Sequence, residues 1–333
     1  MLKRLVLLYL FMVLLCNPGS IDAKASDNEV MLHDSNGRML AEVSGMAVSE
    51  HLLFFIEQRL DILYFLEKET LRAAFHNKSE TVRLKSAVLT GALPNRKSWE
   101  AVTVVNMGDE HRLFLSHEYD GDGDVHQVYS AGIQLHENNI TLGEIGTLGK
   151  ALPFSNDKKI PMKRRANYGY EALVWLQEDS KLLVVPELAQ QDIILIDNKK
   201  QQNYQIERHL YRLSDAAQAS NQCVVFTSFC HPSDYSCKKN NDDSKLTLVS
   251  AKVNNGQLQF VDELDISEKY LALGFDPAIS MSSKKTRLFN AEAIVLFGSG
   301  FLLANDNNPQ GLARSVVRYF PNLSLNSDSC KFQ

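Results

Sequence analysis

The chain has 333 residues, of which 44% are hydrophobic and 23% are charged, and its formal net charge is −5 at pH 7. This balance is typical of a globular protein with a large buried core, and it excludes a chain that is disordered throughout. No basic block stands out against the acidic total, so we expect no nucleic-acid partner.

The first residues are typical of a secretory signal peptide. Lys3 and Arg4 precede an apolar run that ends at Cys16, and Ala23 and Ala25 offer small-residue cleavage sites. The apolar run is shorter than the roughly 20 residues that a membrane-spanning helix needs. We therefore predict a signal peptide over residues 1–23 and a single mature domain over residues 24–333. The mature protein is expected to be a secreted or periplasmic monomer without a membrane span.

Four cysteines remain once the leader is removed: Cys223, Cys230, Cys237 and Cys330. An even number in an exported chain favours two disulfides, for which three pairings are possible. We favour Cys230 with Cys237, which closes a short loop, and Cys223 with Cys330, which ties down the C-terminus. A zinc site is not expected, because zinc-binding cysteines usually stand about two to four residues apart.

Beyond the leader, short runs rich in Val, Ile, Leu, Phe and Tyr alternate with polar turns, which is typical of an all-β chain. One unit recurs: a motif with a small or acidic residue and an apolar tail, then an apolar strand that ends in a polar residue. The motif occurs at Ser44-Gly45-Met46-Ala47, Trp99-Glu100-Ala101-Val102, Tyr170-Glu171-Ala172-Leu173, Ser214-Asp215-Ala216-Ala217 and Ala291-Glu292-Ala293-Ile294.

The remaining strands of each unit can be assigned in the same way. The first four units offer a fourth strand around Val82–Leu89, Ile140–Leu148, Tyr204–Leu213 and Leu258–Ile266. The fifth unit ends near Phe320 after three strands, and the N-terminal stretch Glu29–Leu40 can supply the missing one. Such a strand closes the ring and removes an exposed sheet edge. We predict an all-β fold, a five-bladed β-propeller whose ring is closed by an N-terminal strand. Six blades, or an irregular β-sandwich, remain the alternatives.

In a propeller the first strand of each blade lines the central channel, so residues at one repeat position converge on the axis. Three carboxylates in a narrow channel repel one another unless they are protonated or bridged by a cation. Calcium takes about six to eight oxygen ligands at flexible geometry, which favours Ca²⁺ over magnesium here. The alternative is that each glutamate lies at a solvated channel mouth and binds nothing. The position holds Ser44, Glu100, Glu171, Ser214 and Glu292.

These motifs resemble the first-strand motifs of two propeller groups, the calcium-activated nucleotidases of the apyrase family and the secreted esterase-like phytase group. The apyrase resemblance implies that the two serines and three glutamates hold a central calcium. The segment Glu57–Tyr64 is similar to the apyrase stretch in which an acidic residue and an arginine follow the first inner strand. The strands between Phe301 and Phe320 extend beyond the apyrase pattern, and no N-terminal aspartate-rich catalytic segment is found. The phytase-like group is therefore the better comparison.

A second acidic position follows the second strand of four units and holds Glu57, Glu118, Glu187 and Asp306. Because side chains alternate along a strand, only one of His117 and Glu118 can face the channel. We predict that Glu118 faces inward and that His117 packs between blades.

Two loops also carry charge. The aspartates of Asp120-Gly121-Asp122-Gly123-Asp124 imitate the start of a calcium loop. An EF-hand would then need Gly and Glu where Val125 and Ala131 stand, so a polar hairpin tip is the favoured interpretation. The basic run from Lys158 to Arg165 is expected to be a solvated loop, with attraction of an anionic substrate as the alternative.

The leading hypothesis is a calcium-dependent hydrolase of phosphoesters or carboxyl esters, with a small anionic or ester substrate. Glu118 or Glu187 would orient a water molecule on the ion, and Arg59 would neutralise the transferred or leaving group. The competing hypothesis is a non-catalytic propeller with a structural calcium that binds a protein or glycan partner. A glycosidase is a further alternative, because paired carboxylates across a channel could cleave a glycosidic bond.

Overall fold

The protein is described here by a computed structural model that covers residues 28–108, 110–118, 125–152, 169–187, 193–197, 200–204, 212–229, 246–254, 257–267, 290–306 and 315–333. The predicted signal peptide, the Cys230–Cys237 pair, the Asp120–Asp124 loop and the basic run at 158–165 lie outside these residues. No helix in the described ranges combines the length and the apolar character needed to cross a membrane.

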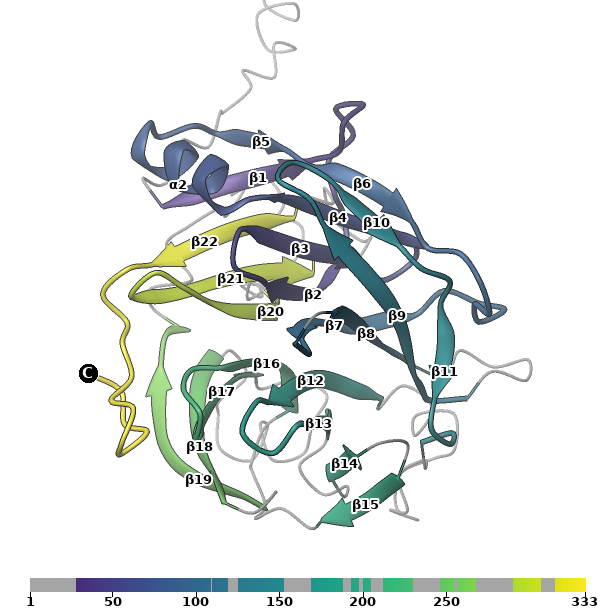
Figure 1. Ribbon diagram of the computed structural model, residues 1–333. Coiled ribbons are helices and arrows are strands. Elements are labelled where there is room, and N and C mark those ends of the chain that lie inside the picture. Colours follow the sequence, from purple (N-terminus) through teal and green to yellow (C-terminus); the bar gives the residue numbers. More distant parts are fainter. Residues whose placement is uncertain are drawn as a thin grey trace, which may run out of the picture.

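The strands form five sheets that are arranged around a central axis (Figure 1). Blade 1 has the order β2 (Val43–Val48), β3 (Leu52–Glu57), β4 (Ile62–Glu67), β6 (Lys85–Val88). Blade 2 has the order β7 (Trp99–Asn106), β8 (His111–His117), β9 (Gln127–Leu135), β10 (Ile140–Leu142), and β11 (Gly146–Leu148) also pairs with β9. Blade 3 has the order β12 (Tyr170–Leu176), β13 (Lys181–Pro186), β14 (Ile193–Asp197), β15 (Lys200–Tyr204).

Blade 4 has the order β16 (Arg212–Gln218), β17 (Cys223–Phe229), β18 (Leu246–Asn254), β19 (Gln257–Asp265). Blade 5 has the order β20 (Asn290–Phe297), β21 (Gly300–Asp306), β22 (Val316–Phe320), β1 (Glu29–His33), β5 (Thr81–Arg83). The first strands β2, β7, β12, β16 and β20 form the inner ring, each packed against the next. The predicted five-bladed propeller is thus confirmed, and six blades are excluded.

The ring is closed by the N-terminal strand, as predicted. β1 pairs antiparallel with β22 and parallel with β5, so it lies between the last strand described and an early strand of the chain. The stretch predicted as the fourth strand of blade 1 divides, because Lys85–Val88 joins blade 1 whereas Thr81–Arg83 crosses to blade 5. Between β4 and β5 the chain forms α2 (Lys68–His76), which the sequence analysis did not predict.

The fourth strand of blade 3 was also placed too late. It is Lys200–Tyr204, a hairpin partner of β14, whereas the structure assigns Arg212 and Leu213 to the first strand of blade 4. The polar composition of the true strand explains the error, because an outer edge strand buries few of its side chains and therefore lacks an apolar signature.

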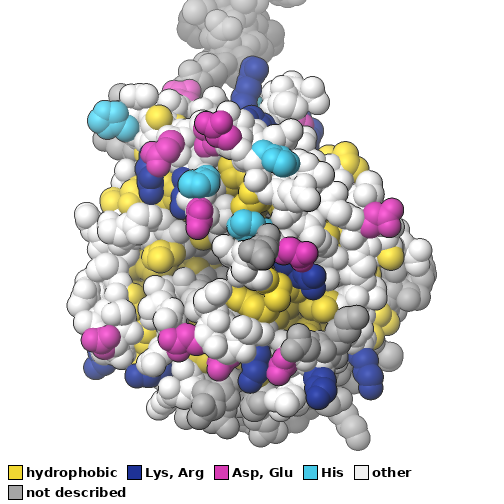
Figure 2. All heavy atoms as spheres, in the orientation of Figure 1, with side chains coloured by type: hydrophobic (Ala, Val, Ile, Leu, Met, Phe, Trp, Pro, Cys, Tyr) yellow, Lys and Arg dark blue, Asp and Glu magenta, His cyan; other side chains and the backbone are white. Residues whose placement is uncertain are grey.

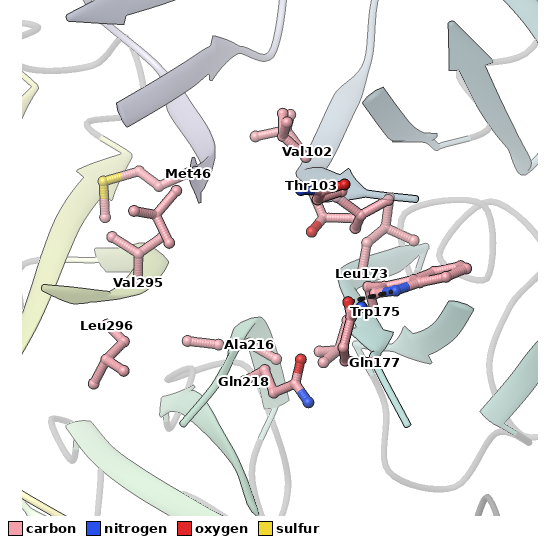
Figure 3. Close-up of a pocket in the computed structure, with 16 residues that line it drawn as sticks. Met46, Val102, Thr103, Leu173, Trp175, Gln177, Ala216, Gln218, Val295 and Leu296 are labelled. Carbon is pink, nitrogen blue, oxygen red and sulfur yellow. Dashed lines mark hydrogen bonds between the residues drawn. The ribbon is translucent and has the colours of Figure 1, made fainter. Parts of the chain in front are cut away.

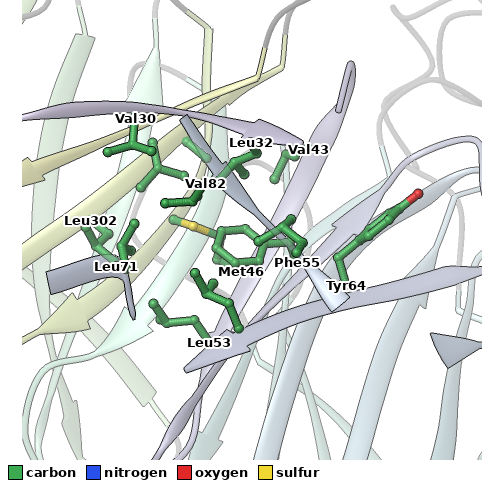
Figure 4. Packing of buried hydrophobic residues seen from close by; sticks show 14 of the residues in the cluster. Val30, Leu32, Val43, Met46, Leu53, Phe55, Tyr64, Leu71, Val82 and Leu302 are labelled. Atoms are coloured by element: carbon green, nitrogen blue, oxygen red, sulfur yellow. The ribbon is translucent and has the colours of Figure 1, made fainter. Parts of the chain in front are cut away.

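The core lies between the blades. Both faces of a second strand pack against other parts of the protein. In blade 1, all six residues of the second strand β3 are buried. This burial explains why the second strands appear in the sequence as continuous apolar runs and not as alternating ones. Figure 4 shows one cluster, in which Val30 and Leu32 of β1 meet Met46, Phe55 and other side chains of blade 1.

The C-terminal segment after β22 is fixed to blade 4 by a disulfide between Cys223 and Cys330, which confirms that predicted pairing. Ser250 donates its hydroxyl to the carbonyl oxygen of Cys330 at 2.5 Å, and the backbone N–H of Phe332 donates to Asp262 Oδ2 at 3.0 Å. The tail, which follows the third strand of blade 5, is therefore attached to blade 4.

Candidate active site in the central channel

A β-bulge occurs at the same place in the inner hairpin of every blade. The pairing between the first and second strands skips one residue each time, and a bulge redirects the side chain of the extra residue. These equivalent positions are the ones that the repeat analysis placed on the axis. The skipped residues are Ser44, Glu100, Glu171, Ser214 and Glu292.

In four of the five blades, the residue after the bulge is small, which allows the inner strands to approach closely. A Cβ atom added to Gly45 would lie 2.8 Å from the backbone nitrogen of Val102. Blade 1 therefore requires glycine at this position, because real Cβ atoms essentially never come so close to backbone. Blades 2, 3 and 5 have Ala101, Ala172 and Ala293 at this position.

The two serines of the ring bridge neighbouring blades. Ser44 donates its hydroxyl to the carbonyl oxygen of Trp99 at 2.6 Å, and Ser214 donates to that of Ala291 at 2.7 Å. Each acceptor is the residue just before the bulge of the next blade, so the two hydrogen bonds are equivalent. Both hydroxyl oxygens keep lone pairs that a cation could use.

Glu100 lies in the wall of the channel and is 2% exposed. Its Oε1 accepts hydrogen bonds from Gln58 Nε2 at 2.7 Å and from Ser98 Oγ at 3.1 Å. Gln58 belongs to the segment after β3, so this contact links blade 1 to blade 2.

Glu171 is surrounded by protein inside the channel, although water can reach part of its surface. Burial raises its pKa well above the usual value, and repulsion by four other carboxylates acts in the same direction. An additional negative charge at this place is therefore unfavourable. The four carboxylates belong to Glu100, Glu187, Glu118 and Glu292.

Glu118 follows β8 and lies between blades 2 and 3. Burial raises its pKa well above the usual value, with further contributions from Glu100 and Glu187. Its Oε1 is buried and has no hydrogen-bond partner among the described residues, while the backbone N–H of Gly169 donates to the same carboxyl group. A Cβ atom on Gly169 would lie 2.8 Å from Glu118 Cγ, so glycine is needed there to leave room for the acid.

Glu187, at the end of the second strand of blade 3, is paired with a cation. Arg212 Nη1 lies 2.8 Å from Glu187 Oε1, and both side chains are largely buried. An adjacent guanidinium favours the ionised form of a carboxylate. Glu118 and Glu187 are thus neighbouring carboxyl groups in different environments: burial raises the pKa of Glu118, whereas Glu187 is paired with Arg212. The sequence analysis did not single out Arg212.

Glu57 and Arg59 differ from this arrangement, whereas Asp306 has the same register as Glu118 and Glu187. Glu57 pairs directly with Val43, one residue earlier than the place of Glu118 and Glu187, and its carboxylate is bound by Arg38 through contacts of 3.0 and 2.6 Å. Arg59 is exposed, donating to the Lys97 carbonyl at 3.1 Å and lying 3.8 Å from Glu42. Asp306 ends β21, and its side chain is outside the description.

His117 was predicted to pack between blades, and the described contacts of its ring lie within blade 2 and the segment before it. The ring is buried, lies 2.9 Å from the carbonyl oxygen of Arg96 through Nε2, and makes edge contacts with Trp99 and Tyr129. Glu118, the next residue in the chain, lies near the carboxyl groups of Glu100 and Glu187.

The residues of the ring fit a hard cation in their chemistry, since they offer carboxylate and hydroxyl oxygens. Their spacing is less favourable. Within the described ranges, no three His, Cys, Asp or Glu side chains are grouped closely enough to hold a metal ion. The predicted calcium site at Ser44, Glu100, Glu171, Ser214 and Glu292 therefore stays a prediction.

Asp215 occupies the position where the other blades have Gly or Ala. Its Oδ2 accepts the backbone N–H of Ile294 at 2.8 Å, and the backbone N–H groups of Ala216 and Met46 also bond its carboxyl group. Burial raises the pKa of Asp215 well above the usual value, against the effect of these donors. Because Ile294 lies on β20 and Met46 on β2, the carboxyl group joins blade 4 to blades 5 and 1.

No model of a known protein family matches the sequence, and no curated protein matches it. Solved structures with a similar fold include an exo-β-1,3-galactanase from Phanerochaete chrysosporium with galactose, at a TM-score of 0.49 and 10% identity, covering 92% of this chain and 70% of that chain. An exo-1,5-α-L-arabinanase from a bovine ruminal metagenomic library has a TM-score of 0.44 and 7% identity, covering 88% of this chain and 96% of that chain.

The β-propeller domain of Cps50 (Swd1) from Myceliophteria thermophila has a TM-score of 0.37 and 8% identity, covering 84% of this chain and 83% of that chain. At these values the similarity concerns the β-propeller fold alone. Function has to be argued from the site.

Proposed function

We propose that this protein is a hydrolase in which Glu118 acts as general acid and Glu187 as general base or nucleophile. The observation that carries the proposal is the pairing of a buried carboxyl group with a raised pKa and a carboxylate held by Arg212. A carboxyl group that keeps its proton, beside a second carboxyl group held by a guanidinium, is an arrangement suited to acid–base hydrolysis.

The charge of the channel supports an uncharged substrate. Glu100, Glu118, Glu171, Glu187 and Glu292 act on one another electrostatically, and the cation described among them, Arg212, is already paired with Glu187. A phosphoester would be repelled unless a metal ion were bound. A glycosidic bond carries no charge and is cleaved by such a carboxyl pair. We therefore assign a glycoside as the substrate class.

In this mechanism Glu118 holds a proton at the pH at which a normal glutamic acid is ionised and passes it to the oxygen of the leaving group. Glu187 either removes a proton from the water that attacks the anomeric carbon, or attacks that carbon itself as the leaving group departs. In the second case water, deprotonated by Glu118, then hydrolyses the glycosyl-enzyme and frees Glu187. Arg212 holds the Glu187 carboxylate in place, and the Gly169 N–H does the same for Glu118. A secreted or periplasmic location would suit an enzyme that acts on extracellular glycans.

The test uses three bond classes with one leaving group. p-Nitrophenyl glycosides of galactose, arabinofuranose, xylose and glucose, p-nitrophenyl acetate and p-nitrophenyl phosphate are incubated with the mature protein, and p-nitrophenol release is followed. We expect release from at least one glycoside. Glu118→Gln should lower kcat by about 10²- to 10⁴-fold. Glu144→Gln, at an exposed turn, is the matched control and should leave kcat unchanged.

A second candidate keeps the calcium-dependent phosphoester or carboxyl-ester hydrolase predicted from the sequence. It is favoured by the identical bulge position of Ser44, Glu100, Glu171, Ser214 and Glu292. If p-nitrophenyl phosphate alone is hydrolysed, and only with calcium, this candidate replaces the first. If no substrate is hydrolysed but calcium raises the melting temperature of the wild type and not of Glu171→Gln, the non-catalytic propeller with a structural ion is favoured.

A further inference from the structure

A surface groove lies where the helix α2 meets the end of blade 5. Its volume is about 350 Å³, and its walls come from α2, from the end of β20, from the end of β22 with Pro321, and from Asn28 just before β1. Figure 1 labels α2 beside β1 and β5, and in the same view Figure 2 shows charged, histidine and hydrophobic side chains close together at that part of the surface.

The groove is distinct from the cavity in the central channel. Leu296 lines the channel cavity (Figure 3), whereas Phe297, the next residue and the last of β20, lines the groove. The bulge at Glu292 lies close to the start of the same strand. The groove is therefore at the end of blade 5 that is away from the glutamates, and it is not part of the proposed hydrolytic site.

Two partly exposed aromatic rings form one wall of the groove. Phe75 of α2 and Tyr319 of β22 are stacked with their ring centroids 5.6 Å apart, and neither ring is fully buried. Phe297, which is 2% exposed, supports Tyr319 edge to face at 5.4 Å. The Arg72 guanidinium lies 5.2 Å from the centroid of Phe297. The two open rings are thus held in place by their neighbours while part of their surface faces the groove.

Polar side chains that line the groove keep their hydrogen-bonding capacity. Within the described ranges, the amide of Asn28, the imidazole of His76 and the hydroxyl of Tyr319 form no hydrogen bond with another side chain or with the backbone. Asn28 and His76 are also exposed. The Arg72 guanidinium differs, because it is paired with Glu69. The groove therefore offers donors and acceptors beside the aromatic rings, and its guanidinium is already neutralised.

A sugar ring matches such a surface. The face of an aromatic ring is electron-rich. The C–H groups on one side of a sugar ring are polarised by the adjacent oxygens and are attracted to that face. The hydroxyl groups at the edge of the sugar need new partners when they leave water, and amide, imidazole and phenol groups supply them. The volume of about 350 Å³ lies within the range of small-ligand sites, roughly 300 to 1,000 Å³.

We propose that the groove is a binding site for a neutral glycan, in which one sugar unit lies against Phe75 and Tyr319 and its hydroxyl groups bond to Asn28 and His76. The choice of a glycan as the ligand rests on the proposed function. The site takes no part in bond cleavage. Because its polar edge is exposed, it can hold one unit of a longer chain, and this contact raises the effective concentration of the rest of the chain near the protein.

The test places a fluorescent reporter in the groove. Phe75→Trp keeps a flat ring there, and it is combined with Glu118→Gln so that the probes are not hydrolysed. The parent protein, Glu118→Gln alone, contains two tryptophans, Trp99 and Trp175, and neither lines the groove. Trisaccharides of galactose, arabinose, xylose and glucose are titrated into both mature proteins, whose folding is checked by their melting temperatures. We expect at least one trisaccharide to cause a saturable change in emission that the parent does not show.

Matched variants of the reporter protein locate the polar contacts. Asn28→Ala and His76→Ala should each weaken binding by about 2- to 10-fold, because each removes one hydrogen bond. His51→Ala is the control, since the His51 side chain is 78% exposed and does not line the groove. 4-Hydroxybenzoate serves as a charged aromatic probe, and we expect it to bind more weakly than the best trisaccharide.

The proposal would be overturned if no trisaccharide changed the emission of the folded reporter protein. Equal effects of His76→Ala, Asn28→Ala and His51→Ala would also overturn it, as would tighter binding of 4-hydroxybenzoate than of every trisaccharide. Because the reporter protein carries Glu118→Gln, binding is measured without hydrolysis. Failure of all p-nitrophenyl glycosides in the activity assay would thus reject the proposed enzyme and leave an observed groove site in place, whereas hydrolysis without groove binding would reject the groove alone.

Discussion

Glu29 and Arg318 stand directly opposite each other on β1 and β22, and their side chains form an ion pair in which each is 3% exposed. The pair joins the first described strand of the chain to the last. It lies where the ring closes, so the closure depends on a buried charged contact as well as on backbone pairing and apolar packing.

Replacement of Glu29 by Gln should therefore lower the free energy of unfolding by about 3 to 5 kcal/mol, because the Arg318 guanidinium would stay buried without its counter-ion. Glu69→Gln removes the partner of Arg72 at an exposed site and should change stability by less than about 1 kcal/mol. Urea unfolding of the two variants and the wild type measures both effects. Similar small losses in both would show that the closure does not rely on the ion pair.

Gly169→Ala should displace Glu118, because the new Cβ would lie 2.8 Å from Glu118 Cγ and 3.1 Å from its Cβ. We expect a loss of about 1 to 3 kcal/mol in stability from overpacking. The loss should be smaller when Glu118→Ala is already present, since the closest atom is then gone. A double-mutant cycle by thermal unfolding gives the coupling. Additive effects would contradict the contact.

Stability contributed by two buried glutamic acids should fall as pH rises above their ordinary pKa of 4.5. Glu118 and Glu171 have a pKa raised well above 4.5 in the folded protein, so the folded state binds more protons than the unfolded state at intermediate pH. The slope of unfolding free energy against pH is then negative. Unfolding free energies are measured from about pH 5 upward, and the comparison of each variant with the wild type cancels the histidine titration that both share. Glu118→Gln and Glu171→Gln should each flatten the slope, whereas Glu144→Gln should not.

The Cys223–Cys330 disulfide spans 107 residues. Its removal by Cys223→Ser with Cys330→Ser should lower the free energy of unfolding by about 4 kcal/mol, since the unfolded chain loses a long constraint. The C-terminal tail should then become sensitive to limited proteolysis before the propeller unfolds. An intact tail and unchanged stability in the double variant would mean that packing of Leu323, Leu325 and Phe332, with the hydrogen bonds from Ser250 and to Asp262, is enough to hold the tail.

The repeat pattern identified equivalent positions in the five inner strands because a bulge recurs in each strand and is followed by a small residue in four of them. Ser44, Glu100 and Glu171 could be recognised from this signal without any knowledge of contacts. Glu57 was placed one residue out of register, since the bulge offset is not visible in the second strand. Arg212 was overlooked because its approach to Glu187 depends on how blade 4 meets blade 3.

The short strand β5 and the helix α2 could not be predicted for a different reason. Thr81–Arg83 is a strand only because β1 is beside it, and its own three residues have no distinctive pattern. A strand that pairs with a distant partner leaves little local trace, whereas the apolar runs of the inner strands identify themselves through burial.

The closure of blade 5 sets the order in which the protein can fold. Glu29 meets a partner 289 residues further along the chain, so this sheet cannot be completed until Arg318 has emerged from the ribosome. Contacts of such long range make folding slow. Until then β1 presents an unpaired edge, and a chain held extended by a chaperone or a translocation channel would be protected from wrong pairing.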